Sequence, residues 1–365
     1  MVATGQGEAF MGRKDGWEDQ TRLGSTCFWL AGLALLLGAC AGTASADGTI
    51  PERLTIYSPA PPKVILYEYN QQLADALDSC PGVPTAAISA VALPDSINEI
   101  GEVTATQKSG ELPIITPLHL RSAIAGAGPE WHSFVRPNPD LKFLSSLYDV
   151  GVGIYAFSPD VRTPQDLIGK RIAAEPRPGA VRLYTELLLR DGWGILDQVE
   201  LVHVGPAELP DAIAEGRVDA VSWNLLLRSP QGYRPWFPSL AVNQPGGWIP
   251  VGQDAVNRIN IANDLSVGRV RVSTYDLGES GVVGLDDPVA LLSFKQGLAG
   301  WESTDDALVT AVLTCIEQHG RLVAGLPDDA ASMANWDGLR ADEVHPAALR
   351  FYSAHMVEIG GAAHD

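Results

Sequence analysis

Two arginines lie in a short stretch that joins a predicted strand to a predicted helix. Arg177 and Arg182 follow a turn and strand expected at 169–174, and Gly179 lies between them near the start of a helix expected at 178–191. A guanidinium group can hold a carboxylate through two parallel hydrogen bonds, so this stretch is suited to binding an organic anion. The alternative is that both arginines are solvated residues at a helix start. The sequence does not decide between these two interpretations.

A second pair of candidate residues follows another predicted strand. Trp223 and Asn224 come soon after a strand expected at 218–221. Ligands of open α/β sheets bind at the carboxyl ends of the strands, so we expect this pair at the ligand-binding edge of the sheet. The alternative is a packing tryptophan beside a turn asparagine.

The elements that must position these residues alternate between short strands and helices. This alternation is clearest between residues 163 and 221, where it predicts βαβ units and a largely parallel sheet in an α/β fold. Along the chain we expect strands at 53–58, 86–92, 112–116, 141–148, 151–157, 169–174, 199–204, 218–221, 268–275 and 281–294. We expect helices at 64–77, 94–101, 178–191, 207–214, 253–261, 305–325 and 347–358.

The N-terminal part has the pattern of an export signal. Residues 28–39 read FWLAGLALLLGA, with basic residues upstream. This run is typical of a secretory signal and is shorter than the roughly 20 apolar residues that span a bilayer. The sequence LGAC that ends in Cys40 resembles the lipobox of bacterial lipoproteins, which implies a signal peptide at 1–39, lipidation of Cys40 and a tether at 40–51. The alternative is cleavage after Ala46, which would release a soluble protein.

Composition narrows the class of protein. The chain has 365 residues, of which 46% are hydrophobic, and a formal net charge of -19. The hydrophobic content is typical of a globular protein with a large core, and the acidic charge argues against a nucleic-acid partner. We find no metal-binding, nucleophile-elbow or paired-carboxylate motif, so we expect no metal site, no cofactor and no enzyme activity. Cys80 and Cys315 lie outside the signal segment, and a disulfide or two buried thiols are equally open.

Residues 148–223 resemble the second lobe of periplasmic solute-binding proteins. The resemblance is carried by DLIGKRIAA at 166–174 and EGRVDAVSW at 215–223. The whole mature chain resembles the TAXI family, the solute receptors of TRAP transporters. That resemblance rests on WIPV at 248–251, VSTY at 272–275 and VHPAALRFY at 344–352, in this order along the chain.

The resemblance implies a two-lobe periplasmic-binding-protein fold of type II, each lobe a mixed, largely parallel sheet flanked by helices. Lobe one would comprise 52–153 and 271–365, and lobe two 154–270. The implied function is an extracytoplasmic receptor that captures a small organic anion, a carboxylate, for TRAP permease subunits in the membrane. It implies a periplasmic protein that contacts the membrane only by its lipid anchor. The alternative is a ligand-sensing or accessory periplasmic module with an altered pocket.

The pocket region departs from the family pattern in two places. Residues 58–63 read SPAPPK where the family has glycines, and a loop without those N–H donors cannot hold an anion in the same way. At 175–181 the family's serine and threonine are missing, and Arg177 has taken a place there. By position, the resemblance implies ligand contacts from Tyr67, Ser96, Asn98, Thr116, Arg177, Gly179, Arg182, Trp223, Asn224 and Tyr275. Simpler roles compete at several of them, such as a core tyrosine at 67 and a helix cap at 98.

Overall fold

The computed structural model describes residues 50–62, 65–91, 93, 95–102, 104–128, 133–205, 208–226, 246–263, 270–275, 289–320, 326–336 and 339–359. The predicted signal peptide, Cys40 and all but the last two residues of the predicted tether lie outside the described residues. Within those ranges, no helix has the length and apolar character needed to cross a membrane.

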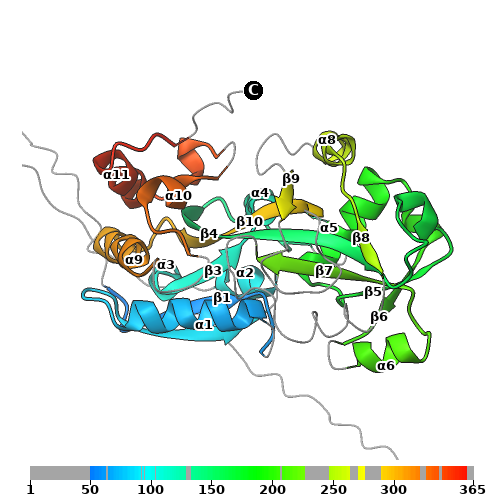
Figure 1. Cartoon of the computed structure of the whole chain (residues 1–365). Coiled ribbons are helices and arrows are strands. Elements are labelled where there is room, and N and C mark those ends of the chain that lie inside the picture. Colours follow the sequence, from blue (N-terminus) through cyan, green and yellow to red (C-terminus); the bar gives the residue numbers. More distant parts are fainter. Residues whose placement is uncertain are drawn as a thin grey trace, which may run out of the picture. The chain divides into compact units, whose positions relative to one another are not determined.

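One mixed β-sheet runs through the fold (Figure 1). Its strands are β1 Arg53–Ser58, β2 Thr85–Ala90, β3 Glu111–Ile115, β4 Leu141–Ala156, β5 Arg171–Ala174, β6 Glu200–His203, β7 Ala220–Leu226, β8 Gly247–Ile249, β9 Arg271–Tyr275 and β10 Val289–Trp301. The order across the sheet is β2-β1-β3-β10-β4-β7-β5-β6, with β8 beside β4 and β9 beside β10.

The sheet has two parallel halves with two long antiparallel strands between them. In the first half β1 pairs in parallel with β2 and β3. In the second half β5 pairs in parallel with β6 and β7. The strands between them, β4 with 16 residues and β10 with 13, pair with each other in antiparallel fashion. This architecture confirms the predicted α/β class: a mixed sheet has two largely parallel halves, which the antiparallel strands β4 and β10 join.

Helices connect the parallel strands, as a parallel pairing requires. They are α1 Ile65–Asp78, α2 Asp95–Ile100, α3 Ala105–Lys108, α4 Pro117–Ala125, α5 Ala180–Leu187, α6 Leu209–Ala214, α8 Gln253–Ala262, α9 Asp306–His319, α10 Ala330–Ala334 and α11 Pro346–Ala354. Local signals start several of them: Thr116 caps α4 with proline at its first position, and Asp305 caps α9. The helix α9, from the C-terminal part of the chain, packs against α1 and therefore covers the first half of the sheet.

Several expected strand boundaries are wrong, among them the end expected at 294 for the strand that continues to Trp301 as β10. Residues 141–148 and 151–157 form the single strand β4, although Gly151 and Gly153 lie inside it. Both glycines are held by pairing with β7, so the backbone continues despite the weak intrinsic preference of glycine for strands. The strand expected at 218–221 instead continues to Leu226, because β7 pairs with β4 over its whole length.

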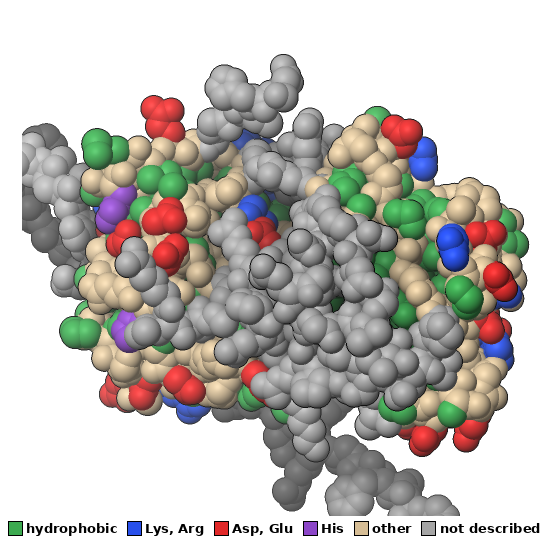
Figure 2. Space-filling view, viewed as in Figure 1, with side chains coloured by type: hydrophobic (Ala, Val, Ile, Leu, Met, Phe, Trp, Pro, Cys, Tyr) green, Lys and Arg blue, Asp and Glu red, His purple; other side chains and the backbone are tan. Residues whose placement is uncertain are grey.

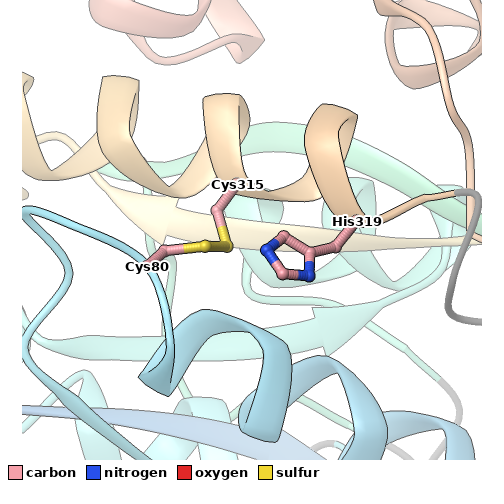
Figure 3. Close-up of side chains that lie close together, drawn as sticks. All are labelled: Cys80, Cys315 and His319. Atoms are coloured by element: carbon pink, nitrogen blue, oxygen red, sulfur yellow. A yellow bond between two sulfur atoms is a disulfide. The ribbon is translucent and has the colours of Figure 1, made fainter.

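A disulfide joins the end of α1 to α9, the two helices that cover the first half of the sheet. Cys80 lies just after α1 and Cys315 lies in α9, and their Cα atoms are 6.0 Å apart. Figure 3 shows His319, one helical turn after Cys315, beside this bond. The two sulfurs and the imidazole lie within metal-ligand reach of one another, but sulfurs bonded to each other are not thiolate ligands. Of the two alternatives left by the sequence, the structure has the disulfide.

Protonation of His345 is expected to destabilise the fold at acidic pH. His345 caps α11: its Nδ1 accepts from the Ala347 N–H at 3.1 Å, while Nε2 donates to the Thr304 carbonyl at 3.1 Å. This arrangement needs the neutral imidazole, and burial lowers the pKa of His345 below its usual value of 6.5. The unfolded chain therefore binds the proton first, so stability is complete above about pH 6.5 and is lost as pH falls below it. Urea unfolding at several pH values should show this loss, and the slope should be smaller in His345→Asn.

Candidate ligand site between the halves of the sheet

The strands β4 and β10 lie between the carboxyl ends of the two parallel halves. In the first half β3 ends at Ile115, and Thr116 follows as the cap of α4. In the second half β5 ends at Ala174 and leads into α5. Loops and helix starts from both halves therefore flank β4 and β10, which is where α/β proteins bind ligands.

Tyr184 connects the two halves at this place. It lies in α5 of the second half, and its hydroxyl donates to Thr116 Oγ1 at 3.0 Å. Its ring stacks on Phe294 of β10, with ring centroids 3.7 Å apart and planes 7° from parallel. Thr116 Oγ1 also bonds to Nδ1 of His119, at 2.5 Å. All four side chains are buried, so this contact is fully removed from water.

Two buried polar groups beside this contact have no hydrogen-bond partner. Tyr148 and Gln296 are direct partners in the β4–β10 ladder, so their side chains lie on the same face of the sheet. The Tyr148 hydroxyl and the Gln296 Oε1 are both buried and unpaired. Gly297, the next residue, pairs with Ile115, which places Gln296 next to the strand end that carries Thr116. We call Thr116, Tyr148, Tyr184 and Gln296 the β4–β10 polar site.

The environment of Tyr148 is otherwise apolar and aromatic. The Tyr69 ring of α1 lies 5.9 Å from the Tyr148 ring, and burial raises the pKa of Tyr148 well above its usual value. Asn70 of α1 donates from its Nδ2 to the Oγ of Ser58, the last residue of β1, at 2.8 Å. The Oδ1 of Asn70 is a further buried oxygen without a partner. A buried polar group without a partner costs about 1–3 kcal/mol, so such groups mark places where a ligand or water completes the bonding.

Both candidate arginines are paired within the second half. Arg177 makes two-pronged contacts of 2.9–3.0 Å to the Glu186 carboxylate, and Arg182 Nε donates to the same carboxylate at 2.6 Å. Glu186 is buried in α5. Glu186 was not among the predicted site residues, although its spacing of four residues from Arg182 on a predicted helix is a recognisable ion-pair signal. A solute carboxylate would have to share these guanidinium groups with Glu186.

Trp223 and Asn224 lie inside a strand and not after one, but they still lie just beyond the carboxyl end of the parallel pairing, since β7 pairs with β5 only at Ala220 and Val221. They lie inside β7, where they pair with Gly153 and Val152 of β4. Since adjacent residues of a strand point to opposite faces, only one of the two faces α5. Ser222, two residues before Asn224, bonds to Thr185 of α5, so Asn224 is on the α5 face. Trp223 packs with the small core of the other face.

The remaining candidates lie in the first half and, for Tyr275, in the strand β9 beside β10. Tyr67 is half-buried against the main core, and Ser96 is buried in α2. Asn98 accepts from the Val135 N–H at 3.1 Å and donates to the Ser133 carbonyl at 3.4 Å, so it holds the segment before β4. Tyr275 ends β9, and its side chain lies outside the described residues.

The structure also has an open pocket of about 660 Å³ on the flank of α9. It surrounds the disulfide and is lined by side chains that include Thr310, Gln318, Asp306 and Arg350. The two charged residues form an ion pair with each other at 2.5 Å. None of the candidate ligand residues and no member of the β4–β10 polar site lines it. On the face shown in Figure 2, acidic side chains are spread over the described surface without a basic patch.

Comparisons with known proteins give one family match, over part of the chain, and several similar solved structures. Residues 143–228, from β4 to the end of β7, match the family described as NMT1/THI5 like. Among solved structures, the chain is similar to R. palustris Rpa4515 with adipate, at 17% identity and a TM-score of 0.47, covering 73% of this chain and 83% of that one. It is also similar to MatC from Rhodopseudomonas palustris with bound malate, at 14% identity and a TM-score of 0.46, covering 84% and 97%.

A third similar structure is the periplasmic binding protein BugD, at 12% identity and a TM-score of 0.45, covering 84% of this chain and 95% of that one. No curated protein matches the chain. At these identities and TM-scores, the likenesses carry no argument about what this chain binds. The resemblance to TAXI receptors in particular stays a prediction.

Proposed function

We propose that this chain is an exported solute-binding receptor that holds a small organic solute at the β4–β10 polar site and releases it unchanged. The observation that supports this most is the pair of buried, unpaired groups on Tyr148 and Gln296, next to the Thr116–Tyr184 contact between the halves. A solute with a hydrogen-bond donor and an acceptor would satisfy both groups. Movement of the halves about β4 and β10 would admit and release it.

The finer assignments in this proposal come from the sequence. They are a carboxylate solute, TRAP-type permease subunits as partners, a periplasmic location with a lipid anchor at Cys40, and a division into lobe one (52–153 and 271–365) and lobe two (154–270). The Tyr148 hydroxyl, which has no partner, can donate a hydrogen bond to a carboxylate. The other candidate contacts are Asn224, on the α5 face, and the residues of the first half named above.

A ligand-sensing or accessory module is the second candidate. The pairing of Arg177 and Arg182 with Glu186 favours it, because the expected carboxylate clamp is already occupied. Uptake of the bound solute by cells that carry the permease, and its loss on deletion of this receptor, would favour transport. Binding without an effect on uptake would favour sensing.

A thermal-shift screen with small organic acids tests the receptor proposal directly. A solute that binds only the folded chain at a hundredfold excess over its Kd adds about 2.7 kcal/mol of stability. Stabilisation by a set of chemically related acids, with no turnover, is the expected result. Turnover of the bound acid would contradict the proposal.

Replacing Tyr148 by phenylalanine is expected to weaken solute binding by at least about tenfold while leaving the fold intact. The variant removes only a hydroxyl that has no partner in the unliganded chain, so the free energy of unfolding should not fall. Isothermal titration with the solute from the screen measures the affinity. Tyr57→Phe is the matched control, since the Tyr57 hydroxyl bonds to Glu111 in the first half. Equal affinity of Tyr148→Phe and the unaltered chain would exclude the β4–β10 polar site.

A further inference from the structure

Glu175 turns its carboxylate back onto the first turn of the helix that follows it. It comes directly after β5, and its carboxylate accepts hydrogen bonds from the backbone N–H groups of Val181 and Arg182 at the start of α5. Gly179 lets the carboxylate approach, since a Cβ there would lie only 2.3 Å from Glu175 Oε2. A helix start with free N–H groups attracts anions, and here a side chain of the same chain takes that place.

The carboxylate of Glu175 has neither a full set of hydrogen bonds nor an arginine as counter-ion in this position. Its Oε2 is buried and has no hydrogen-bond partner. Arg177 and Arg182 both direct their guanidinium groups to Glu186, and Arg182 reaches only the backbone carbonyl of Glu175, at 3.4 Å. Burial accordingly raises the pKa of Glu175, against the opposing effect of the two N–H donors.

The side-chain charges at the start of α5 indicate that Glu175 takes the place of a bound anion. Arg177 and Arg182 contribute two positive charges and Glu186 one negative charge, which leaves one positive charge beside the free N–H groups. Glu175 brings the sum to zero. Without its carboxylate, the start of α5 would combine a net positive charge, two backbone donors and space of carboxylate size, which together make an anion site.

We propose that Glu175 is a built-in occupant of an anion site at the start of α5, and that a carboxylate or a free oxyanion such as sulfate binds there only when the Glu175 side chain is absent or withdrawn. The anion site itself does not depend on the proposed function; only the role of Glu175 in choosing a solute rests on it. In a receptor, Glu175 would keep the acidic group of a solute away from the second half and direct it to the β4–β10 polar site. Glu175 is then a determinant of specificity that acts by exclusion.

Glu175→Ala in the full exported chain tests the inference with inorganic sulfate as the probe. We expect the unaltered chain to show no saturable sulfate binding by isothermal titration. Glu175→Ala should bind sulfate saturably, at least about tenfold more tightly than the weakest binding that the titration detects. Sodium chloride at matched ionic strength controls for screening. Glu175→Gln should behave as the unaltered chain, because its side-chain oxygen can still cover the N–H groups. Glu200→Ala, at an exposed residue of β6, should also leave sulfate binding unchanged.

A folded Glu175→Ala chain with no gain in sulfate binding would overturn the inference. If that variant does not fold, Glu175→Ser provides the same test with a short side chain that is well tolerated near a helix start. Failure of the organic-acid screen leaves this test unaffected, since sulfate needs no knowledge of the solute. Conversely, a chain that binds an acid but shows no sulfate site in either variant would keep the receptor proposal and reject the role of Glu175.

Discussion

Replacing both Cys80 and Cys315 by alanine is expected to lower the free energy of unfolding by about 4 kcal/mol. The bond links residues 235 positions apart, so its removal frees a very long loop in the unfolded chain. It also ties the end of α1 to α9, and these helices come from opposite ends of the chain and cover the same half of the sheet. Urea unfolding, followed by tryptophan fluorescence, measures the change.

The unaltered chain with its disulfide reduced should unfold at the same urea concentration as the double variant. Circular dichroism should show that the double variant keeps its secondary structure in the absence of urea. A loss below about 1 kcal/mol would mean that the bond adds little to the noncovalent packing of α1 on α9.

Glu186→Ala is expected to destabilise the chain by about 3 kcal/mol, through the loss of a buried charge that two arginines share. The Glu186 side chain is only 4% exposed and that of Arg182 only 13%, so the variant leaves a largely buried guanidinium group without its counter-ion. Arg177 is about half-exposed and should recover much of its solvation. The measurement is the same urea titration.

An exposed pair provides the control for Glu186. Glu215→Ala breaks the contact between Glu215 and Arg217, where both side chains face solvent, and should cost less than about 0.5 kcal/mol. Glu186→Gln should lie between the two variants, because it keeps hydrogen bonds and removes the charge. If Glu186→Ala and Glu215→Ala lose equal stability, the Arg177–Glu186–Arg182 cluster does not behave as a buried ion pair.

Much of the fold could be predicted because its signals are local. The strand expected at 53–58 is β1, residue for residue. The helix α4 was not predicted, although Thr116 and the proline that follows it are a local signal for a helix start. The predictions were wrong where pairing with another strand extended an element, as in β7, whose last residues have no strong local preference. Trp223 and Asn224 therefore lie within β7 and not after it, in the part of the strand that extends past its pairing with β5.

The candidate site was less predictable than the fold. Thr116 was expected from its place at the end of a strand, and it is a member of the β4–β10 polar site. Tyr148 ended a predicted strand but carried no signal that its hydroxyl is buried, and Gln296 lay beyond the strand expected at 281–294. Their pairing depends on the register between β4 and β10, and register is set by long-range packing of the two strands.

By itself, the sequence determined the α/β class, the alternation of strands and helices, and the acidic character of the chain. These follow from hydrophobic periodicity, capping residues and composition, each of which acts over a few neighbouring residues. Only the tertiary structure decided that Glu186 takes both arginines, that Glu175 covers the start of α5, and that Tyr148 and Gln296 face each other. Such choices depend on which charges and polar atoms are buried together, and burial is a property of the packed chain.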